Sequence, residues 1–199
     1  MTLKHLAIIP DGNRRWARAK GLPTLEGHRR GYNLVKDIGK WAVERGVAHL
    51  SIWGFSTENW KRSKEEVGYL MDLIEMALVK ELKHYKKEEI RVRVIGSREG
   101  LPDHVLKAID TVERETAGNG RGQLNLCINY GGQPEILEAT KRLLAAGVKP
   151  EELTPERFTQ ETWLADVPPV DLIIRTSGEQ RLSGFMSWSG GYAELLFLQ

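Results

Sequence analysis

The sequence predicts an α/β fold in which a central parallel sheet of six strands is surrounded by helices. Short apolar runs alternate with segments whose apolar residues recur at helical spacing. Strands that alternate with helices form a parallel sheet covered on both faces. The alternation runs along the whole chain without a linker, a repeat or a low-complexity stretch, so residues 1–199 are interpreted as one domain.

Six apolar runs are expected to form the strands. They are residues 6–9, 49–55, 90–95, 124–129, 170–174 and 192–198. Each is short, and most are bounded by glycine, proline or polar residues, as strands of a buried sheet are.

Helices are expected between these strands. The first begins after the turn at residues 11–13, and longer helices are expected at residues 31–43 and 63–87. Further helices are expected to begin at Pro102, at Pro134 and at Pro155, where proline fits a first turn that has no use for its missing N–H. Trp41 and Trp163 are expected in the core.

Composition excludes several classes of protein. The net charge of +2 is too small to indicate a nucleic-acid partner. Cys127, the single cysteine, lies in an apolar run and is expected to be a buried, reduced thiol. The start of the chain has no signal-peptide pattern, and no apolar stretch approaches the roughly 20 residues of a membrane span. The sequence therefore predicts a cytoplasmic protein, which could still work at a membrane surface.

Four unusual loops follow predicted strands, at residues 11–16, 56–62, 129–132 and 175–183. Ligands of open parallel sheets bind beyond the carboxyl ends of the strands. These loops are therefore the places where a site is expected.

The first loop has the chemistry of an anion site. A strand ends in Asp11, Gly12 and Asn13, and Arg14 and Arg15 follow as a helix begins. Such a turn presents backbone N–H groups and a positive helix end to an anion. The acid would repel a bare anion but suits a metal ion that bridges to phosphate oxygens, so a metal-assisted diphosphate site is predicted. The alternative is a common turn before a solvated helix.

Two other loops are also rich in groups that bind oxyanions, and each has a structural alternative. Residues 56–62 combine hydroxyl, amide and arginine side chains, but Ser63 and Glu66 form a capping-box pattern and Trp60 could serve packing. Residues 175–183 contain two arginines and two serines after a buried strand, but Glu179 could pair with these arginines in a surface network.

Five separated motifs carry a family resemblance. They are residues 9–13 (Ile-Pro-Asp-Gly-Asn), 27–28 (Gly-His), 55–62 (Phe-Ser-Thr-Glu-Asn-Trp-Lys-Arg), 129–132 (Asn-Tyr-Gly-Gly) and 175–183 (Arg-Thr-Ser-Gly-Glu-Gln-Arg-Leu-Ser). In this order they resemble the cis-prenyltransferases, of which undecaprenyl diphosphate synthase is the bacterial type. The resemblance extends from His5 to about Phe197.

The resemblance implies a reaction, a cofactor and an assembly. Enzymes of this family extend an allylic diphosphate, usually farnesyl diphosphate, with isopentenyl diphosphate, and each new double bond is cis. They require Mg²⁺, make polyprenyl diphosphates for carrier lipids, and are homodimers with a hydrophobic tunnel beside a parallel sheet. The second strand and the apolar face of the helix at residues 63–87 are the expected tunnel walls.

The resemblance also implies roles for individual residues. Asp11 would hold Mg²⁺ and assist departure of the diphosphate, Glu194 would help to hold the metal, and Asn59 would be the proton acceptor. A neutral amide is a poor base, so released diphosphate is an alternative acceptor. Substrate contacts are expected at Gly12, Asn13, Arg14, Arg15, Trp16, His28, Ser56, Thr57, Glu58, Trp60, Arg62, Arg175, Arg181, Leu182 and Ser183.

The chain departs from the family pattern at several positions. Arg14 stands where glycine is common, Thr24 where arginine is common, and residues 187–191 lack the usual bulk. The chain ends at Gln199, before a terminal Arg-x-Gly segment that the family normally has and that completes the partner's site. Two alternatives therefore accompany the enzyme hypothesis: an accessory subunit of the same fold that requires a partner chain, and an unrelated phosphate-binding or phosphohydrolase domain.

Overall fold

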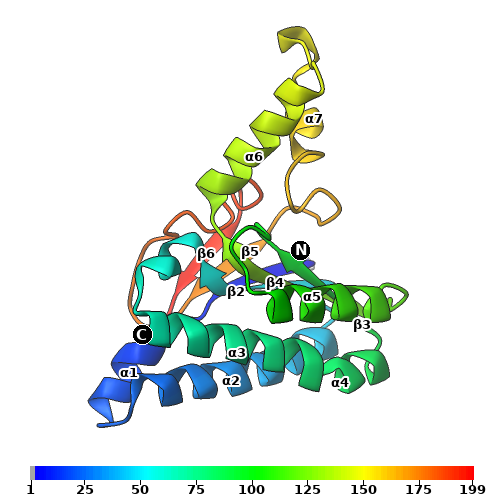
Figure 1. Ribbon diagram of the computed structural model, residues 1–199. Coiled ribbons are helices and arrows are strands. Elements are labelled where there is room, and N and C mark those ends of the chain that lie inside the picture. Colours follow the sequence, from blue (N-terminus) through cyan, green and yellow to red (C-terminus); the bar gives the residue numbers. More distant parts are fainter. Residues whose placement is uncertain (1–2) are drawn as a thin grey trace.

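The computed structural model describes residues 3–199, apart from the side chain of Lys36, and its strands form one sheet (Figure 1). All neighbouring strands are parallel, and their order is β3-β4-β2-β1-β5-β6. The strands are β1 His5–Ile9, β2 His49–Ser56, β3 Ile90–Ile95, β4 Gly122–Tyr130, β5 Leu172–Arg175 and β6 Glu194–Phe197. The predicted six-stranded parallel sheet is therefore confirmed.

The helices also follow the predicted pattern, with differences in their bounds. The helix expected at residues 31–43 begins seven residues earlier, at Thr24. The expected helix at residues 63–87 is divided at Glu81, and the helix expected to begin at Pro134 begins two residues earlier, so that this proline lies in its first turn. The helices are α1 Asn13–Ala19, α2 Thr24–Glu44, η1 Thr57–Lys61, α3 Lys64–Lys80, α4 Leu82–Lys87, α5 Asp103–Thr116, α6 Gly132–Ala145, η2 Pro150–Glu152 and α7 Pro155–Thr159. Among the described residues, no helix has both the length and the apolarity that crossing a membrane requires.

Helices cover one face of the sheet. The aliphatic side chains of β1, β2, β3 and β4 on this face pack against α2, α3, α4 and α5, which lie below the sheet in Figure 1. Leu78 of α3 and Val105 of α5 are fully buried in this core. This layer provides the wall of a cavity described below.

Irregular segments cover the other face. Phe185 and Met186, both fully buried, pack with Cys127 and Tyr130 of β4. The sheet is covered on both faces, as predicted, but helices alone do not provide the cover. Helices α6 and α7 project from the sheet as an arm (Figure 1). Burial raises the pKa of the Cys127 thiol, as expected for an inert core cysteine.

The two tryptophans expected in the core differ. Trp163 is partly buried and packs edge-on against Tyr130, with ring centroids 5.8 Å apart. Trp41 is 49% exposed on the outer face of α2, so its core assignment is wrong. The reason is that α2 turns Val35, Ile38, Ala42 and Val43 toward the core and leaves this indole on the solvent side.

A buried polar network connects three strands of the sheet. His5 is fully buried, its Nδ1–H donates to the carbonyl of Pro168 at 2.7 Å, and its Nε2 lies 2.7 Å from Ser51 Oγ. Asn125 donates to the same hydroxyl at 3.0 Å. Because a carbonyl can only accept, Nδ1 carries a proton, and burial, which lowers the pKa of His5, favours the neutral ring.

The network predicts a loss of stability on mild acidification. Burial lowers the pKa of His5 from its usual 6.5, so the unfolded chain binds this proton more tightly than the folded chain. The free energy of unfolding should therefore fall as the pH drops below about 6.5, and His5→Gln should flatten this dependence while costing about 1–3 kcal/mol at pH 8. Urea unfolding from pH 5 to 8 measures both effects.

The exposed imidazole of His84 provides a matched control. His84→Gln should keep the wild-type urea midpoint. An unchanged pH slope in His5→Gln would contradict the role assigned to His5.

Candidate active site

The four loops predicted to form a site lie at one edge of the sheet. Strand register brings Ile9 beside Arg175, and Arg175 beside Phe197. The loops after β1 and β5 therefore begin level with each other. This edge is on the left in Figure 1, where α1 begins and the C-terminus lies.

Asp11 and Arg175 form the centre of this edge. Arg175 is 5% exposed, and its Nη2 donates to Asp11 Oδ2 at 2.8 Å. Asp11 Oδ1 accepts from the N–H of Gly12 at 2.6 Å, and the Thr176 hydroxyl donates to the Asp11 carbonyl at 2.8 Å. Partial burial acts to raise the pKa of Asp11, but the hydrogen bond and charge of Arg175 outweigh it and hold that pKa below its usual value. The carboxylate is therefore anionic at neutral pH.

Arg175 also organises the loop that follows β5. Its Nη1 donates to the carbonyl of Arg181 and to Ser183 Oγ, the latter at 3.0 Å. Its Nε is buried and has no protein partner among the described atoms. A buried guanidinium with a free donor is suited to an anion, because an unpaired buried polar group is costly.

The surface network weighed as an alternative for this loop is present as well. Glu179 accepts from Arg15 Nη1 at 2.8 Å and from Arg181. This carboxylate links an arginine of the first loop to one of the last loop. The network therefore holds Arg15 and Arg181 close together, and it is compatible with an anion site at this edge.

Backbone packing explains the glycine in the first loop. Gly12 has a φ of +94°, and a Cβ built on it would lie 2.3 Å from Ser177 Oγ. A larger residue would be strained in conformation and would also push away the loop after β5. Gly12 therefore lets the first and last loops approach each other.

A second polar cluster surrounds Glu66. Its Oε1 lies 2.9 Å from Arg62 Nη1, 3.2 Å from His28 Nε2 and 3.7 Å from Arg14 Nε. Its N–H bonds Ser63 Oγ at 3.2 Å, so the predicted helix cap exists, but the carboxylate faces the site. Burial acts to raise the Glu66 pKa, and the bond from His28 and the two arginines lower it overall. The interpretation of Glu66 as a cap alone is therefore too narrow.

Glu66→Gln tests whether this carboxylate positions the two arginines. If these arginines bind an anionic substrate, we expect its KM to rise about tenfold, because one charge-assisted contact contributes about 1.5–3 kcal/mol. Steady-state kinetics with each substrate varied separately measures the effect. Glu65→Gln removes the neighbouring exposed carboxylate and should behave as wild type. A lower KM in Glu66→Gln would show that Glu66 competes with the substrate.

The loop after β2 is held by two side-chain contacts. Asn59 Oδ1 accepts from the N–H of Ser56 at 3.1 Å, which caps η1. Trp60 packs edge-on against Phe55 and donates from Nε1 to Asn129 Oδ1 at 2.8 Å. The carbonyl of Asn59 is thus engaged in holding its own loop.

Asn129 is a residue whose part in the site was not predicted. It has a φ of +50°, and its Nδ2 donates to the carbonyls of Ser97 and Glu99 at 3.1 and 2.9 Å. With its bond from Trp60, it joins the loops after β2, β3 and β4. Its place in the motif at residues 129–132 indicated that Asn129 lies in a loop at the site, but it did not indicate which groups Asn129 contacts.

Most of the predicted residues line one cavity, and five do not. Trp16, Thr57, Trp60 and Leu182 are chain neighbours of lining residues but do not line it, while Glu194 is remote. Trp16 is partly exposed under the Arg30 guanidinium, and Leu182 packs against the second core. The predicted residues in the lining are Asp11, Gly12, Asn13, Arg14, Arg15, His28, Ser56, Glu58, Asn59, Arg62, Arg175, Arg181 and Ser183.

The structure does not bring Glu194 to Asp11. Glu194 is the first residue of β6 and pairs with Leu172, which in turn lies beside Leu6 at the start of the sheet. Asp11 follows the other ends of these strands, and a parallel strand rises about 3.3 Å per residue. These two carboxylates therefore cannot hold one ion within a single chain, and the metal role of Glu194 stays a prediction.

The cavity extends from the polar edge into the helix-covered core. It has a volume of about 730 Å³ and passes between β2 and β4 on one side and α2 and α3 on the other. Its inner walls are mostly aliphatic, and they include Val35, Val43, Leu50, Ile74, Leu126 and Ile128. The cavity lies where the tunnel walls were predicted, and it offers an apolar chain a route inward from the arginines.

The polar edge of the sheet could hold a metal ion that arrives bound to a substrate. Among residues 3–199, with the Lys36 side chain set aside, no three His, Cys, Asp or Glu side chains converge to hold an ion. Asp11 provides one carboxylate at the mouth of the cavity. Mg²⁺ commonly uses one or two carboxylates together with substrate phosphates and water, so Asp11 could hold it once a diphosphate is bound.

Sequence comparisons match this chain to isoprenyl transferases. The sequence profile of a family described as "Putative undecaprenyl diphosphate synthase" matches residues 9–199. The isoprenyl transferase of Thermotoga maritima is 48% identical over 98% of this chain and 85% of its own length. The decaprenyl diphosphate synthase of Mycobacterium leprae is 45% identical over 97% of this chain and 67% of its own.

Solved structures share the fold. Lavandulyl diphosphate synthase from Lavandula x intermedia, in complex with dimethylallyl diphosphate, superposes with a TM-score of 0.94 at 33% identity, over 98% of this chain and 86% of that one. A probable undecaprenyl diphosphate synthase from Campylobacter jejuni gives a TM-score of 0.83 at 33% identity, over 99% and 86%.

Proposed function

This chain belongs to the undecaprenyl diphosphate synthase family of isoprenyl transferases, and from that premise we propose a specific reaction for it. It joins isopentenyl diphosphate to an allylic diphosphate, with farnesyl diphosphate as the expected first acceptor. The product is a cis-polyprenyl diphosphate for carrier-lipid synthesis. The observation that carries this proposal is a pair of arginine clusters, joined by the Asp11–Arg175 contact, at the mouth of one apolar cavity.

Each arginine cluster would hold one diphosphate. Arg14 and Arg15, with Gly12 and Asn13, would bind the allylic diphosphate, and His28 lies beside them at the Glu66 cluster. In the second cluster, Arg175, Arg181 and Ser183 would bind the diphosphate of isopentenyl diphosphate. Holding both reactants together makes their condensation effectively intramolecular.

The chemistry requires charge stabilisation and removal of a proton. The allylic C–O bond breaks, diphosphate leaves with the electron pair, and the double bond of isopentenyl diphosphate attacks the resulting delocalised cation. Loss of one proton then forms the new double bond. Arginine side chains stabilise the negative charge that grows on the leaving group. Mg²⁺, when bound, would supply further stabilisation of that charge.

Released diphosphate is the better candidate for the proton acceptor. The Asn59 amide is a poor base, and its carbonyl oxygen accepts the hydrogen bond that caps η1. We assign Asn59 a positioning role in the loop after β2. The growing hydrocarbon would occupy the cavity between the sheet, α2 and α3, where each buried methylene contributes about 0.8 kcal/mol.

A condensation assay tests the proposal. The purified chain is incubated with Mg²⁺, labelled isopentenyl diphosphate and either farnesyl or dimethylallyl diphosphate, and the extracted lipids are sized. Labelled polyprenyl products from farnesyl diphosphate would support the proposal. Products formed from dimethylallyl diphosphate alone would overturn the assigned acceptor, and absence of labelled lipid under all conditions would favour the accessory-subunit alternative.

A homodimer is part of the same proposal. Edge strand β6 and the residue after it leave Leu195, Leu196 and Leu198 between 42% and 47% exposed, and apolar edge strands favour association. The Leu198 carbonyl also accepts a 2.7 Å hydrogen bond from the N–H of Gly178, so the end of the chain after β6 contacts the arginine loop.

Leu196→Asp is therefore expected to give a monomer in sedimentation velocity and to raise the KM for isopentenyl diphosphate. The reason is that a charge on this edge opposes burial against a second copy. Val79→Asp, at an exposed apolar position on α3, is the control and should stay dimeric. A monomeric wild type would refute the proposed assembly.

A further inference from the structure

One carboxylate, Glu179, contacts an arginine of each proposed diphosphate cluster. Its Oε1 accepts from Arg15 Nη1 at 2.8 Å, and its Oε2 accepts from Arg181 Nη1. Asp11 forms a similar link, 3.6 Å from Arg15 and 2.8 Å from Arg175. The structure therefore holds these arginines on carboxylates of the chain itself, at the positions where the proposed function places two diphosphates.

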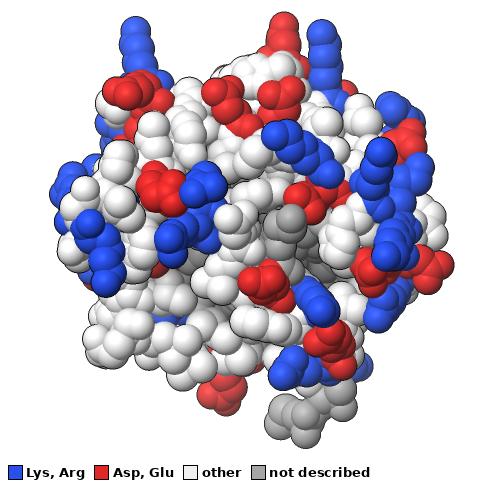
Figure 2. Space-filling view, turned by 90° about the horizontal axis from the view of Figure 1, so that it is seen from below, with Lys and Arg blue, Asp and Glu red and all other residues white. Residues whose placement is uncertain are grey.

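The link through Glu179 can open more easily than the link through Asp11. The side chains of Arg15 and Arg181 are 52% and 60% exposed, whereas Arg175 is buried. Exposed ion pairs add little to stability, so a competing anion can replace them. Figure 2 views the molecule from the side of α1 and α2 and shows Lys and Arg side chains beside Asp and Glu side chains on its left, on the side of α1. The contact and the charge of Arg181 hold the pKa of Glu179 below its usual value, so this carboxylate is an anion that a bound diphosphate can displace.

Repeated elongation requires each diphosphate to change clusters between rounds. The lengthened chain carries the diphosphate that isopentenyl diphosphate brought, so this group lies at Arg181 when the new bond has formed. In the next round the same diphosphate is the leaving group and has to lie at Arg15. The diphosphate released in the first round has to leave Arg15 before that transfer. Arginine clusters that held diphosphate without competition would slow both steps, because contacts between guanidinium and phosphate groups are strong.

We propose that Glu179 competes with diphosphate at both clusters, and that it thereby promotes release from Arg15 and transfer from Arg181. When a diphosphate leaves one of these arginines, the carboxylate takes its place, so the cation is not left without a partner. When a diphosphate arrives, it has to replace this contact, which lowers its apparent affinity for the site. The role in transfer rests on the proposed function, whereas the competition itself rests on the two contacts of Glu179.

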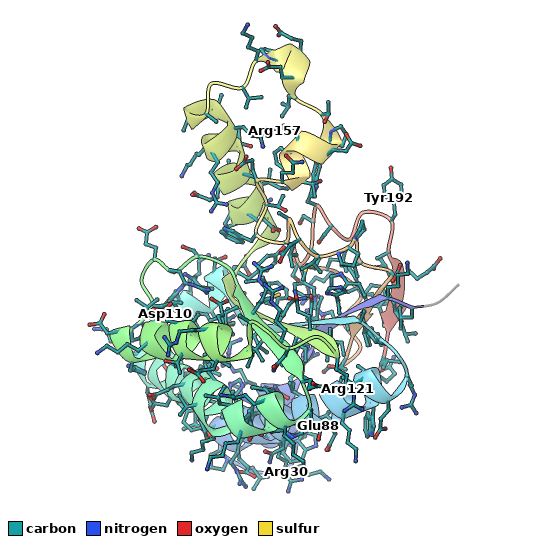
Figure 3. The ribbon with its side chains drawn as sticks, turned by 90° about the vertical axis from the view of Figure 1, so that its right-hand side faces the viewer. Arg30, Glu88, Asp110, Arg121, Arg157 and Tyr192 are labelled. Carbon is teal, nitrogen blue, oxygen red and sulfur yellow. The ribbon has the colours of Figure 1, made fainter. Side chains whose placement is uncertain are left out.

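An ion pair at the other end of the sheet provides a matched control. Arg121 Nη1 lies 2.8 Å from Glu88 Oε2, the same distance as in the Arg15–Glu179 pair, and the two side chains are 48% and 34% exposed. Glu88 precedes β3 and Arg121 precedes β4, so this pair lies at the amino ends of the strands, where Figure 3 labels both residues. Glu88→Gln therefore removes the same charge as Glu179→Gln, but away from the arginine clusters.

Calorimetry with inorganic diphosphate and Mg²⁺ tests the competition without turnover. Glu179→Gln should bind diphosphate about fivefold more tightly than wild type, because the competing charge is removed while the shape of the side chain is kept. Glu179→Asp retains the charge and should bind more like wild type than like the glutamine variant, and Glu88→Gln should bind as wild type. A carboxylate that only braces the loop after β5 predicts the opposite sign, since its loss would loosen Arg181 and weaken binding.

Condensation kinetics test the role in transfer. In Glu179→Gln, a single round with prebound substrates should stay within about tenfold of wild type, whereas the rate of later rounds should fall further as released diphosphate stays bound. Equal or weaker diphosphate binding by Glu179→Gln would overturn the proposal, and equal slowing of the first and later rounds would overturn the role in transfer. A wild type that never condenses its substrates, with the difference in diphosphate binding intact, would refute the proposed function and leave the competition standing.

Discussion

Asp11→Ala is expected to lower kcat for condensation by a factor on the order of 10³. The variant removes the carboxylate at the mouth of the cavity and with it the proposed ligand for Mg²⁺. It also leaves the buried Arg175 without the acid it pairs with at 2.8 Å. Single-turnover assays with saturating Mg²⁺ and both substrates measure the chemical step directly.

Asp11→Asn and Glu179→Gln separate the possible causes of this loss. The asparagine keeps the shape of Asp11 and removes its charge, so activity should stay low while the fold is retained. Glu179 contacts Arg15 and Arg181 at the same edge but is not assigned a metal. Its variant should lose about tenfold or less, as expected for exposed ion pairs. Equal losses in the Asp11 and Glu179 variants would contradict the special role of Asp11.

Arg175→Gln is expected to raise the KM for isopentenyl diphosphate about 100-fold, with a smaller effect on the KM for the allylic substrate. Arg175 is buried, and its contacts to Arg181 and Ser183 shape the second cluster. Glutamine has neither the positive charge nor the several N–H donors of the arginine guanidinium. Initial rates with each substrate varied in turn measure the two effects separately.

The same variant should shift the pH dependence of the reaction. Arg175 holds the pKa of Asp11 below its usual value against the opposing effect of partial burial. Without the guanidinium the burial effect remains, so the pKa of Asp11 rises and the acid limb of the kcat/KM profile moves to higher pH. An acid limb that stays in place would contradict the link between Arg175 and Asp11. Arg181→Gln, at an exposed arginine, should leave this limb unmoved.

The sequence was sufficient for the strands and for the edge of the sheet where the site lies. Six apolar runs appear as six strands, because strands in the middle of a covered parallel sheet are largely apolar and the edge strands β3 and β6 still keep enough apolar residues to be detected. The division of the expected helix at Glu81 was not predicted, since neither glycine nor proline marks it. The cover on the second face was not predicted either, because irregular segments have no periodicity to detect.

Within the site, local motifs located residues but not their contacts. Asp11 and Arg175 were placed at strand ends, and parallel register then brings those ends together. The separation of Glu194 from Asp11 within one chain was not predicted, because the level of Glu194 depends on the pairing of β6 with β5, which the sequence does not reveal. Glu66 and Asn129 were undervalued because their partners, among them His28 and Trp60, are distant in the chain.

The central claim is that two diphosphates bind at separate arginine clusters with the allylic chain in the apolar cavity. A crystal structure with Mg²⁺, isopentenyl diphosphate and an unreactive allylic thiodiphosphate tests it most directly. We predict the thiodiphosphate at Arg14 and Arg15, the other diphosphate at Arg175 and Arg181, and the hydrocarbon between α2, α3 and the sheet. Both diphosphates in one cluster, or an allylic chain outside the cavity, would contradict it.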